Sequence, residues 1–245
     1  ETLEKFASPE LDRIEGPNNP YSSLRLFGSS QSNVRVTLYR DHHAWCPYCQ
    51  KVWLWLEWKQ IPYRIKKVTM RCYGRKESWY LKKVPSGILP AIELDKKIII
   101  ESDDILLALE KTFGPLGNSL LHSQTTILRR LERTLFRAWC IWLCNPSLNK
   151  NQEFHRQSQF QLIAKEMDNL LQKGDQFLLE PILSDSKITY PGSGDIIFIP
   201  YLERMNASLA YYKGFFLRKE YKFIDKWFKT LEGLDVYRGT QGDFH

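Results

Sequence analysis

The chain has 245 residues, of which 43% are hydrophobic and 13% aromatic, so it can bury a core as one large domain or two ordinary ones. Its 35 Lys and Arg against 28 Asp and Glu give a modest net charge of +7. No apolar run approaches the roughly 20 residues of a membrane-spanning helix, and no nucleic-acid-binding motif accompanies the charge, so we expect neither membrane nor nucleic acid as a partner.

The first half of the chain alternates between strand and helix patterns. Residues 1–33 are rich in Pro, Ser, Asn and Gly without periodicity, and we interpret them as an N-terminal extension. Apolar residues then alternate from Val34 to Leu38, which predicts a strand, and the spacing becomes helical over residues 50–60. The elements predicted next are a strand at 63–70, a short helix at 75–83, a hairpin at 91–100 and a helix at 102–114.

After the helix breaker FGPLGNS, at residues 113–119, only helical patterns follow. Two apolar faces lie within residues 131–142 and 160–171, and further helices are predicted at about 194–211 and 215–231. The sequence therefore predicts an α/β domain followed by an all-α domain. The expected boundaries are an extension at 1–33, an α/β domain at 34–113, a linker at 114–120, a helical domain at 121–235 and a tail at 236–245 that precedes a further C-terminal region.

The motif CPYC, at residues 46–49, lies at the junction between a predicted strand and helix. Pro47 favours the first helical position, so the Cys46 thiol would face the free N–H groups and the positive end of the helix, which stabilise a thiolate. We expect Cys46 to be exposed and Cys49, one turn further, to be buried and less ionised. The five cysteines do not resemble a disulfide framework, so the motif indicates a reactive thiol. A metal site completed by His42, His43 or Cys72 and inert packing are the alternatives.

Two further segments predict a ligand site. Pro90 directly precedes a predicted strand, which favours a cis Leu89–Pro90 bond and would leave the Leu89 backbone free to pair with a peptide-like ligand. Ser102 is predicted as a helix N-cap, where its hydroxyl and the free N–H groups would hold a carboxylate, although capping alone would also explain it. Glu101 beside it could accept an amine.

The segment 64–83 holds eight basic residues against one acid, Glu77. Such a run is either a solvated face or a positive field that attracts an anionic substrate. A thiolate, a strand-like backbone edge, an amine acceptor and a carboxylate cradle together match a ligand such as glutathione, which carries the complement of each and is anionic.

These motifs resemble those of cytosolic-type glutathione transferases, over about residues 34–235. The matching segments are CPYC at 46–49, VPSGILP at 84–90, ES at 101–102 and DIIFIPYLER at 195–204. The pattern is most similar to the cysteine-dependent branch (omega, lambda and dehydroascorbate-reductase types), and within it to the plant and algal iota class. In the helical domain, Asp195 resembles the family's capping aspartate, with Gly192 in place of the usual Ser or Thr.

The resemblance implies a thioredoxin-like N-terminal domain, an all-α C-terminal domain and glutathione as the cofactor. It implies a glutathione-dependent thiol transferase or reductase that removes glutathione from mixed disulfides or reduces dehydroascorbate. Cys46 would be the nucleophile, and Cys49 would open a glutaredoxin-like route. The residues expected to bind glutathione are Trp45, Pro47, Lys76, Leu89, Pro90, Glu101 and Ser102, and no metal is expected.

The expected partners are glutathione, glutathionylated or hydrophobic small molecules and a second copy of the chain in a homodimer. The resemblance implies a chloroplast location, with the cytoplasm as the alternative. Two other functions remain open: a non-catalytic protein that binds glutathione and hydrophobic ligands, and a carrier of a glutathione-ligated iron–sulfur cluster.

Overall fold

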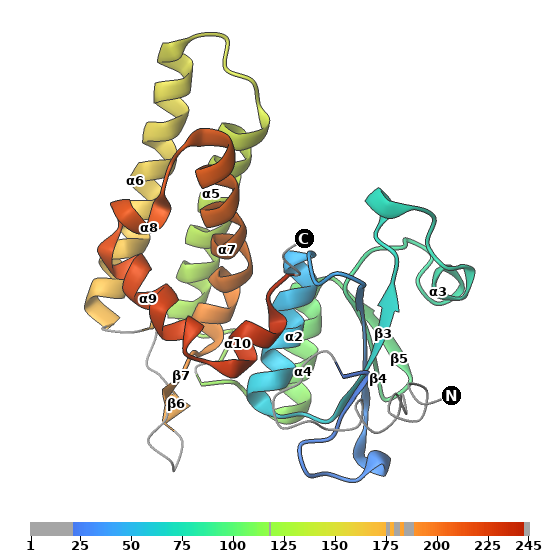
Figure 1. Cartoon of the computed structure of the whole chain (residues 1–245). Coiled ribbons are helices and arrows are strands. Elements are labelled where there is room, and N and C mark those ends of the chain that lie inside the picture. Colours follow the sequence, from blue (N-terminus) through green and yellow to red (C-terminus); the bar gives the residue numbers. More distant parts are fainter. Residues whose placement is uncertain (1–21, 118, 175–176, 179–181, 184–188, 243–245) are drawn as a thin grey trace, which may run out of the picture. The chain divides into compact units, whose positions relative to one another are not determined.

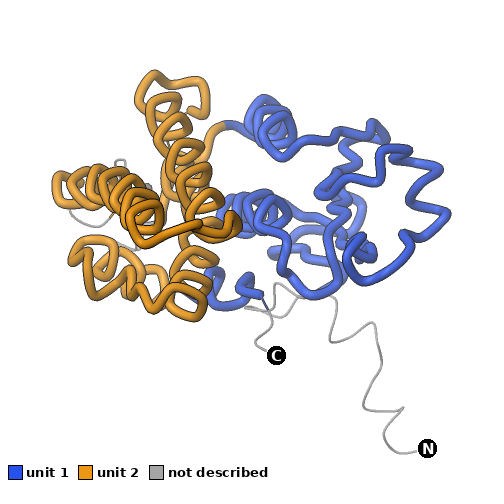
Figure 2. The backbone as a smooth tube through the Cα atoms, turned by 90° about the horizontal axis from the view of Figure 1, so that it is seen from above, with its two compact units in different colours: residues 1–114, 234–245 blue, residues 115–233 orange. Residues whose placement is uncertain are grey.

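The computed structural model of the chain describes residues 22–242 apart from 118, 175–176, 179–181 and 184–188, so most of the predicted extension lies outside the described residues. The chain divides into two compact units, residues 1–114 with 234–245 (unit 1) and residues 115–233 (unit 2) (Figure 2). None of the helices within the described residues is both long and apolar enough to cross a membrane.

Unit 1 is built on a five-stranded mixed sheet with the order β1-β3-β2-β4-β5 (Figure 1). Strands β2 and β3 are parallel, and the other neighbouring pairs are antiparallel. The predicted strands and the predicted hairpin are confirmed, with shifts of a few residues at their ends. The strands are β1 (Leu24–Arg25), β2 (Val36–Asp41), β3 (Tyr63–Val68), β4 (Ala91–Leu94) and β5 (Lys97–Ile100).

Helices cover both faces of this sheet (Figure 1). Helix α2 (Pro47–Lys59) packs against β2 and against α4 (Ser102–Phe113). On the opposite face, α3 (Ser78–Lys83) places Tyr80 in a core cluster with Tyr39 of β2. Successive residues of β2 point to opposite faces, so Arg40 lies over the Trp53 ring of α2, 4.0 Å from its centroid.

Helix α2 is buried along almost its whole length, since every residue from Cys49 to Glu57 is buried. The sheet, α4 and α10 (Asp235–Thr240) all pack against it. A charge this deep needs partners. Glu57 accepts hydrogen bonds from Arg25 of β1 at 2.9 and 3.0 Å and from the Tyr63 hydroxyl at 2.6 Å.

Two elements of unit 1 differ from the sequence-based expectation. Strand β1 lies inside the predicted extension at 1–33 but pairs with β3 and carries Arg25 into the core. The expected tail at 236–245 begins as α10, which packs on α2, and residues 234–245 group with unit 1. Both segments are short, so their structure depends on tertiary partners that no local pattern reveals.

Unit 2 is mainly helical, as predicted, but it also holds a short antiparallel pair of strands, β6 and β7, which the sequence analysis did not predict. Helix α5 packs against α6 and α7, and α9 packs against α6. Its core includes an aromatic cluster of Trp142, Phe160 and Phe215, with ring centroids 5.3–6.1 Å apart. The helix predicted at 215–231 is two helices that meet at Tyr221. The elements are α5 (Ser123–Cys144), α6 (Lys150–Gly174), β6 (Ile182–Leu183), β7 (Thr189–Tyr190), α7 (Ser193–Lys213), α8 (Leu217–Glu220) and α9 (Lys222–Glu232).

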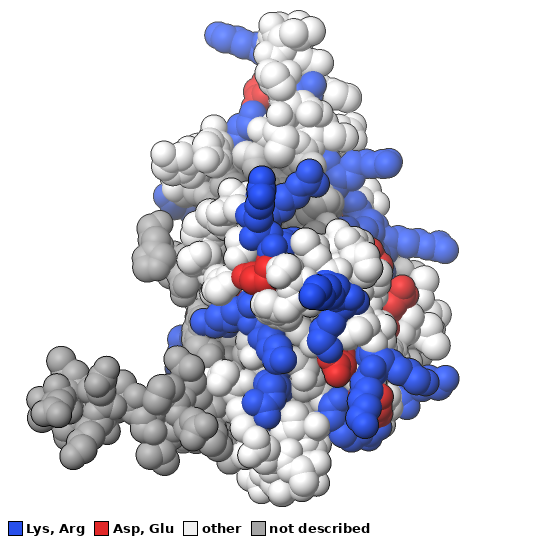
Figure 3. Space-filling view, turned by 90° about the vertical axis from the view of Figure 1, so that its right-hand side faces the viewer, with Lys and Arg blue, Asp and Glu red and all other residues white. Residues whose placement is uncertain are grey.

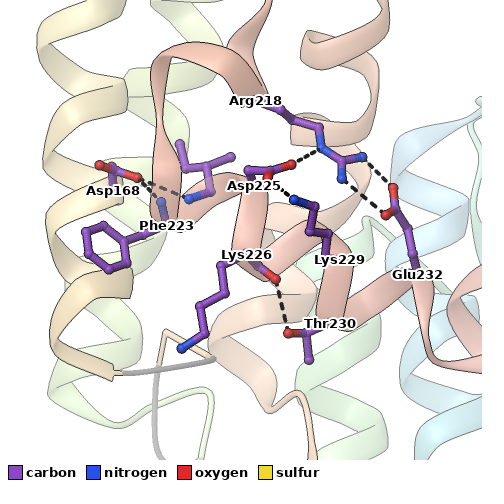
Figure 4. A network of polar contacts seen from close by, with 9 residues as sticks. Asp168, Arg218, Phe223, Asp225, Lys226, Lys229, Thr230 and Glu232 are labelled. Carbon is purple, nitrogen blue, oxygen red and sulfur yellow. Dashed lines mark hydrogen bonds and ion pairs between the residues drawn. The ribbon is translucent and has the colours of Figure 1, made fainter.

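Acidic side chains fix the helix termini of unit 2. Asp195, buried in the first turn of α7, accepts hydrogen bonds from the backbone of Gly192 and from the Trp227 indole. Gly192 has no hydroxyl to cap the helix, but its backbone N–H still donates to the Asp195 carboxylate, so this part of the expected capping arrangement is present. Asp168 of α6 accepts from the first N–H groups of α9, and Arg218 bridges Asp225 and Glu232 (Figure 4).

Candidate functional site

Cys46 is the N-cap of α2 and Pro47 is its first residue, as the sequence predicts. The expectation that Cys46 is exposed is wrong, because only 8% of the residue is accessible. The preceding loop folds back, with the Trp45 backbone N–H donating to Asp41 Oδ2 at 2.7 Å, and this turn brings Cys46 against the end of the sheet. Cys49 is 1% exposed, as predicted.

The two thiols have opposite electrostatic environments. The pKa of Cys46 is lowered, chiefly because the Cys49 side chain donates a hydrogen bond to its sulfur and also because the backbone N–H groups of Cys49 and Tyr48 face it. The pKa of Cys49 is raised well above its usual value, first by burial and then by its interaction with Cys46. Cys46 is therefore the thiol that ionises first, and thiolates are the reactive form of cysteine.

Cys46 lines a cavity of about 800 Å³ in unit 1. This volume lies within the range of typical small-molecule sites. The cavity lies between the start of α2, the segment that follows β3 and the segment that precedes β4. Its other lining residues are Met70, Arg71, Cys72, Gly74, Arg75, Lys76, Leu81, Ser86, Gly87, Ile88 and Leu89.

Two of the expected glutathione-binding residues line this cavity with Cys46. Lys76 does so while its ammonium group donates to the Thr69 carbonyl at 2.8 Å. Leu89 precedes Pro90 through a cis peptide bond, as predicted. Among the described residues no hydrogen bond involves the Leu89 backbone, so its N–H and C=O remain available to a ligand.

Glu101 and Ser102 are not among the residues that line the cavity. The N-cap of α4 is Glu101, with φ 64°, so the prediction that Ser102 is the N-cap is wrong by one position. Ser102 is the first residue of the helix and is buried, whereas Glu101 is exposed. The structure thus brings Cys46, Lys76 and Leu89 together and places Glu101 and Ser102 beyond this group.

Trp45 also lies outside the cavity lining, although it is adjacent to Cys46 in sequence. Its ring packs with His43 and Tyr73, at centroid distances of 5.5 and 5.3 Å. The backbone at Gly242, near the end of the described chain, runs so close to the same indole that a side chain there would meet it. Trp45 therefore supports the loop before α2 rather than the wall of the cavity.

Asp41 is a member of this site that sequence reasoning missed. It is fully buried at the end of β2, and its Oδ1 has no hydrogen-bond partner within the described residues. One ligand-type atom from each of Asp41, Cys46 and Cys49 lies within 4.8 Å of the others. His42, His43 and Cys72 are not part of this group, which provides three donors where a structural zinc site takes four. In the sequence, Asp41 stands five residues before Cys46, in RDHHAWC, and this proximity could have identified it as a candidate site residue.

The cavity has a basic wall. Arg71, Arg75 and Lys76 line it, and they belong to the run of eight basic residues between Arg64 and Lys83. Lys and Arg side chains also predominate over Asp and Glu on the face shown in Figure 3. A positive wall beside a thiolate stabilises the thiolate and attracts anionic ligands.

The N-terminal part of the chain matches a known family model. Residues 45–112 match the model described as "Glutathione S-transferase, N-terminal domain". A relative in Oryza sativa subsp. japonica, "Probable glutathione S-transferase DHAR2, chloroplastic", is 24% identical over 197 residues, which are 80% of this chain. The match covers 65% of the rice protein, so the chain spans somewhat less than two thirds of that relative.

Solved structures show the same fold. The dehydroascorbate reductase of Chlamydomonas reinhardtii superposes with a TM-score of 0.67 at 19% identity, over 85% of this chain and 93% of that one. Glutathione transferase Omega 3C from Trametes versicolor gives a TM-score of 0.65 at 24% identity, over 86% and 90%. The chain therefore has the glutathione transferase fold: a thioredoxin-like domain with a mixed sheet, followed by a helical region.

Proposed function

We propose that this chain is a glutathione-dependent thiol transferase or reductase whose nucleophile is Cys46. The observation that carries the proposal is a thiol of lowered pKa at a helix N-terminus, in the wall of a basic cavity. A deprotonated sulfur at neutral pH attacks disulfides, whereas a protonated thiol does not. The Chlamydomonas protein is described as a dehydroascorbate reductase, which supports a reductive thiol reaction over other chemistries of this fold.

Glutathione fits the donor set of the cavity as a substrate. Its cysteinyl backbone can pair with the free N–H and C=O of Leu89, and this places its sulfur beside Cys46. Its glycine carboxylate can reach Arg71, Arg75 or Lys76. The γ-glutamyl end then extends toward the start of α4, where Glu101 can accept the amine and the Ser102 hydroxyl and the positive end of the helix can hold the carboxylate.

In the proposed reaction the Cys46 thiolate attacks the glutathione sulfur of a mixed disulfide and releases the other thiol. A second glutathione thiolate then attacks the Cys46 adduct, which yields oxidised glutathione and regenerates the Cys46 thiolate. The side chains of the cavity orient the substrate and stabilise the thiolate. Glutathionylated small molecules or proteins are the proposed oxidised substrates of this step. With dehydroascorbate, the Cys46 thiolate adds to a carbonyl carbon, a glutathione thiolate then attacks the Cys46 sulfur, and ascorbate leaves with the electron pair of the broken bond; the resulting Cys46–glutathione disulfide is resolved as above.

The thiols can be separated by substitution. Cys46→Ser should abolish turnover with a glutathione mixed disulfide, whereas the matched variant Cys49→Ser should retain a substantial part, because glutathione itself can resolve the Cys46 adduct. Mass spectrometry after treatment with oxidised glutathione should show one adduct of about 305 Da in Cys49→Ser and none in Cys46→Ser. Turnover by Cys46→Ser together with an inactive Cys49→Ser would refute the proposal.

The γ-glutamyl contacts can be tested by calorimetry in the Cys46→Ser background, which prevents covalent capture. Loss of one charged hydrogen bond costs about 1.5–3 kcal/mol, so Ser102→Ala or Glu101→Ala should weaken glutathione binding roughly tenfold or more. Ser78→Ala is the matched control, because Ser78 is the first residue of α3, is exposed and lies outside the cavity lining. Unchanged affinity in both test variants would remove Glu101 and Ser102 from the site.

We further propose that the chain belongs to the iota type within the cysteine-dependent branch, on the basis of its CPYC motif. A plastid is the proposed location, since the name of the rice relative includes "chloroplastic". We propose a homodimer as the assembly, and sedimentation of the purified chain at several concentrations tests it.

A further inference from the structure

We propose that Asp41 is the proton acceptor for Cys49 when the Cys46–Cys49 disulfide closes. This inference rests on the proposed function, because it concerns the fate of the Cys46 adduct. Asp41 is the last residue of β2, it pairs in register with Val68 of β3, and it is fully buried. One carboxylate oxygen, Oδ2, accepts the Trp45 N–H at 2.7 Å, and the other, Oδ1, has no hydrogen-bond partner within the described part of the chain.

A buried carboxylate oxygen without a partner carries a cost in folding free energy, and such groups in native proteins often serve chemistry. Here the neighbours are the two thiols. An oxygen of Asp41 and the sulfurs of Cys46 and Cys49 lie within 4.8 Å of one another. A separation of up to 4.8 Å exceeds a hydrogen bond, and catalytic hydrogen bonds are often long before the substrate binds.

Cys49 needs an acceptor of this kind. It is 1% exposed, and burial raises its pKa well above the usual value, so at neutral pH it holds its proton and cannot attack as a thiolate. Solvent hydroxide has little access to so deep a group. Asp41 is the carboxylate placed beside it, so it can take the proton inside the protein.

Closing the internal disulfide moves one proton and one electron pair. In the Cys46–glutathione mixed disulfide, the Cys49 proton passes to the Asp41 carboxylate and the Cys49 sulfur attacks Cys46 Sγ. A Cys46–Cys49 disulfide forms, the bond between Cys46 and the glutathione sulfur breaks, and its electron pair leaves with glutathione as a thiolate, which is protonated by water. The oxidant is the mixed disulfide supplied by the first half of the reaction. When glutathione later reopens the internal disulfide at Cys46, Asp41 returns the proton to Cys49.

The other groups around this pair do not compete for the proton. Arg40, on the same strand, donates to the Asp41 carbonyl oxygen at 2.7 Å, and its positive charge favours the carboxylate. Tyr73, in the segment after β3, and Tyr80 of α3 interact with Asp41 and Cys49 respectively, and both have raised pKa values, so both stay neutral near pH 7. The Cys46 sulfur is bonded to glutathione in the adduct, so it cannot accept the proton.

The test measures the closing step directly. Reduced protein is mixed with excess oxidised glutathione, quenched with acid and analysed by mass spectrometry, so that conversion of the Cys46 adduct into the internal disulfide is followed with time. At pH 7 this conversion should be about a hundredfold slower in Asp41→Asn than in the wild type, within the usual contribution of a positioned base. Asn still offers an oxygen to the Trp45 N–H, and circular dichroism checks that the variant is folded.

The pH profile separates a proton acceptor from a structural role. In the wild type the closing rate should be nearly constant between about pH 7 and 8.5, because transfer to an internal carboxylate does not require hydroxide. In Asp41→Asn it should rise about tenfold per pH unit. A wild-type rate that itself rises tenfold per unit would overturn the proposal even if the variant fails to fold.

A second background controls for effects on Cys46. In Cys49→Ser, turnover uses glutathione as the resolving thiol, so the effect of adding Asp41→Asn in this background measures what the Asp41 charge does to Cys46 alone. The closing step should slow by much more than this. Equal slowing in both backgrounds, a wild-type profile in Asp41→Asn or a wild type that never forms the internal disulfide would each overturn the role of Asp41. These results would still leave adduct formation at Cys46 intact, whereas failure of the proposed function would appear as the absence of that adduct.

Discussion

The buried ion pair between Arg25 and Glu57 has an exposed counterpart in the same unit, and the two provide a matched test of what burial does to a charge pair. Two guanidinium nitrogens of Arg25 donate to the Glu57 carboxylate at 2.9 and 3.0 Å, with side-chain exposures of 3% and 0%. Arg35 and Asp95 repeat the two-bond arrangement at 2.8 and 2.5 Å, but with exposures of 47% and 48%. The pairs are alike in geometry and differ in solvent access.

The substitution Arg25→Met keeps a long unbranched side chain and removes the guanidinium. Glu57 then retains the Tyr63 hydroxyl at 2.6 Å but loses its cation in a site without solvent. Removing one partner of a buried pair costs about 3–5 kcal/mol, which is a large part of the 5–15 kcal/mol that stabilises a typical domain. With urea m-values of about 1–3 kcal/mol/M, the unfolding midpoint should fall by about 1 M or more. Arg35→Met should leave the midpoint unchanged, because water replaces the lost partner.

Urea unfolding of both variants, followed by tryptophan fluorescence and circular dichroism, tests this difference. The single variant Glu57→Gln and the double variant Arg25→Met/Glu57→Gln complete the cycle, since Gln still accepts from the Tyr63 hydroxyl but leaves no buried charge. The double variant should recover part of the stability lost in Arg25→Met. Equal midpoints for Arg25→Met and Arg35→Met, or a double variant that shows only the sum of two losses, would refute the reasoning.

Much of the fold could be predicted because long elements carry their own periodicity. The apolar spacing of α2, α5 and α6 and the alternation in β2 reflect burial on one or more faces, and these elements lie where the patterns predict. Strand β1 and helix α10 have only 2 and 6 residues, which is too short for a period. Strand β1 is held by the ion pair between Arg25 and Glu57, and α10 is held by its packing on α2. Both contacts join segments that are distant in the sequence.

The site was predictable where residue identity alone sets the geometry. Pro47 is the first residue of α2, so it determines which backbone N–H groups face Cys46. Pro90 favours the cis Leu89–Pro90 peptide bond that the structure contains. Burial was not predictable in the same way. Cys46 is buried because the loop before α2 folds back, with the Trp45 N–H donating a hydrogen bond to Asp41. The same turn brings the Asp41 carboxylate close to the two thiols. An aspartate at a strand end has many roles, and its sequence position does not distinguish them.

Two predictions concern unit 2. Arg218→Met removes the bridge between Asp225 and Glu232 that Figure 4 shows, and it should lower the free energy of unfolding by about 1 kcal/mol. Because solvent reaches this network, the loss should be smaller at about 1 M salt. A shift of the urea midpoint that does not respond to salt would contradict this prediction. Asp195→Asn should change how stability depends on pH. Burial raises the pKa of Asp195 from 3.8 to about 6, so the folded state binds this proton more tightly than the unfolded state does. Its contribution is therefore complete below about pH 4 and is lost as the pH rises through about 6, a change of about 3 kcal/mol. Asn does not titrate, so relative to Asp195→Asn the wild type should lose about that much stability between pH 4 and 7 in urea unfolding. Parallel curves for the two proteins would mean that Asp195 keeps an ordinary pKa despite its burial.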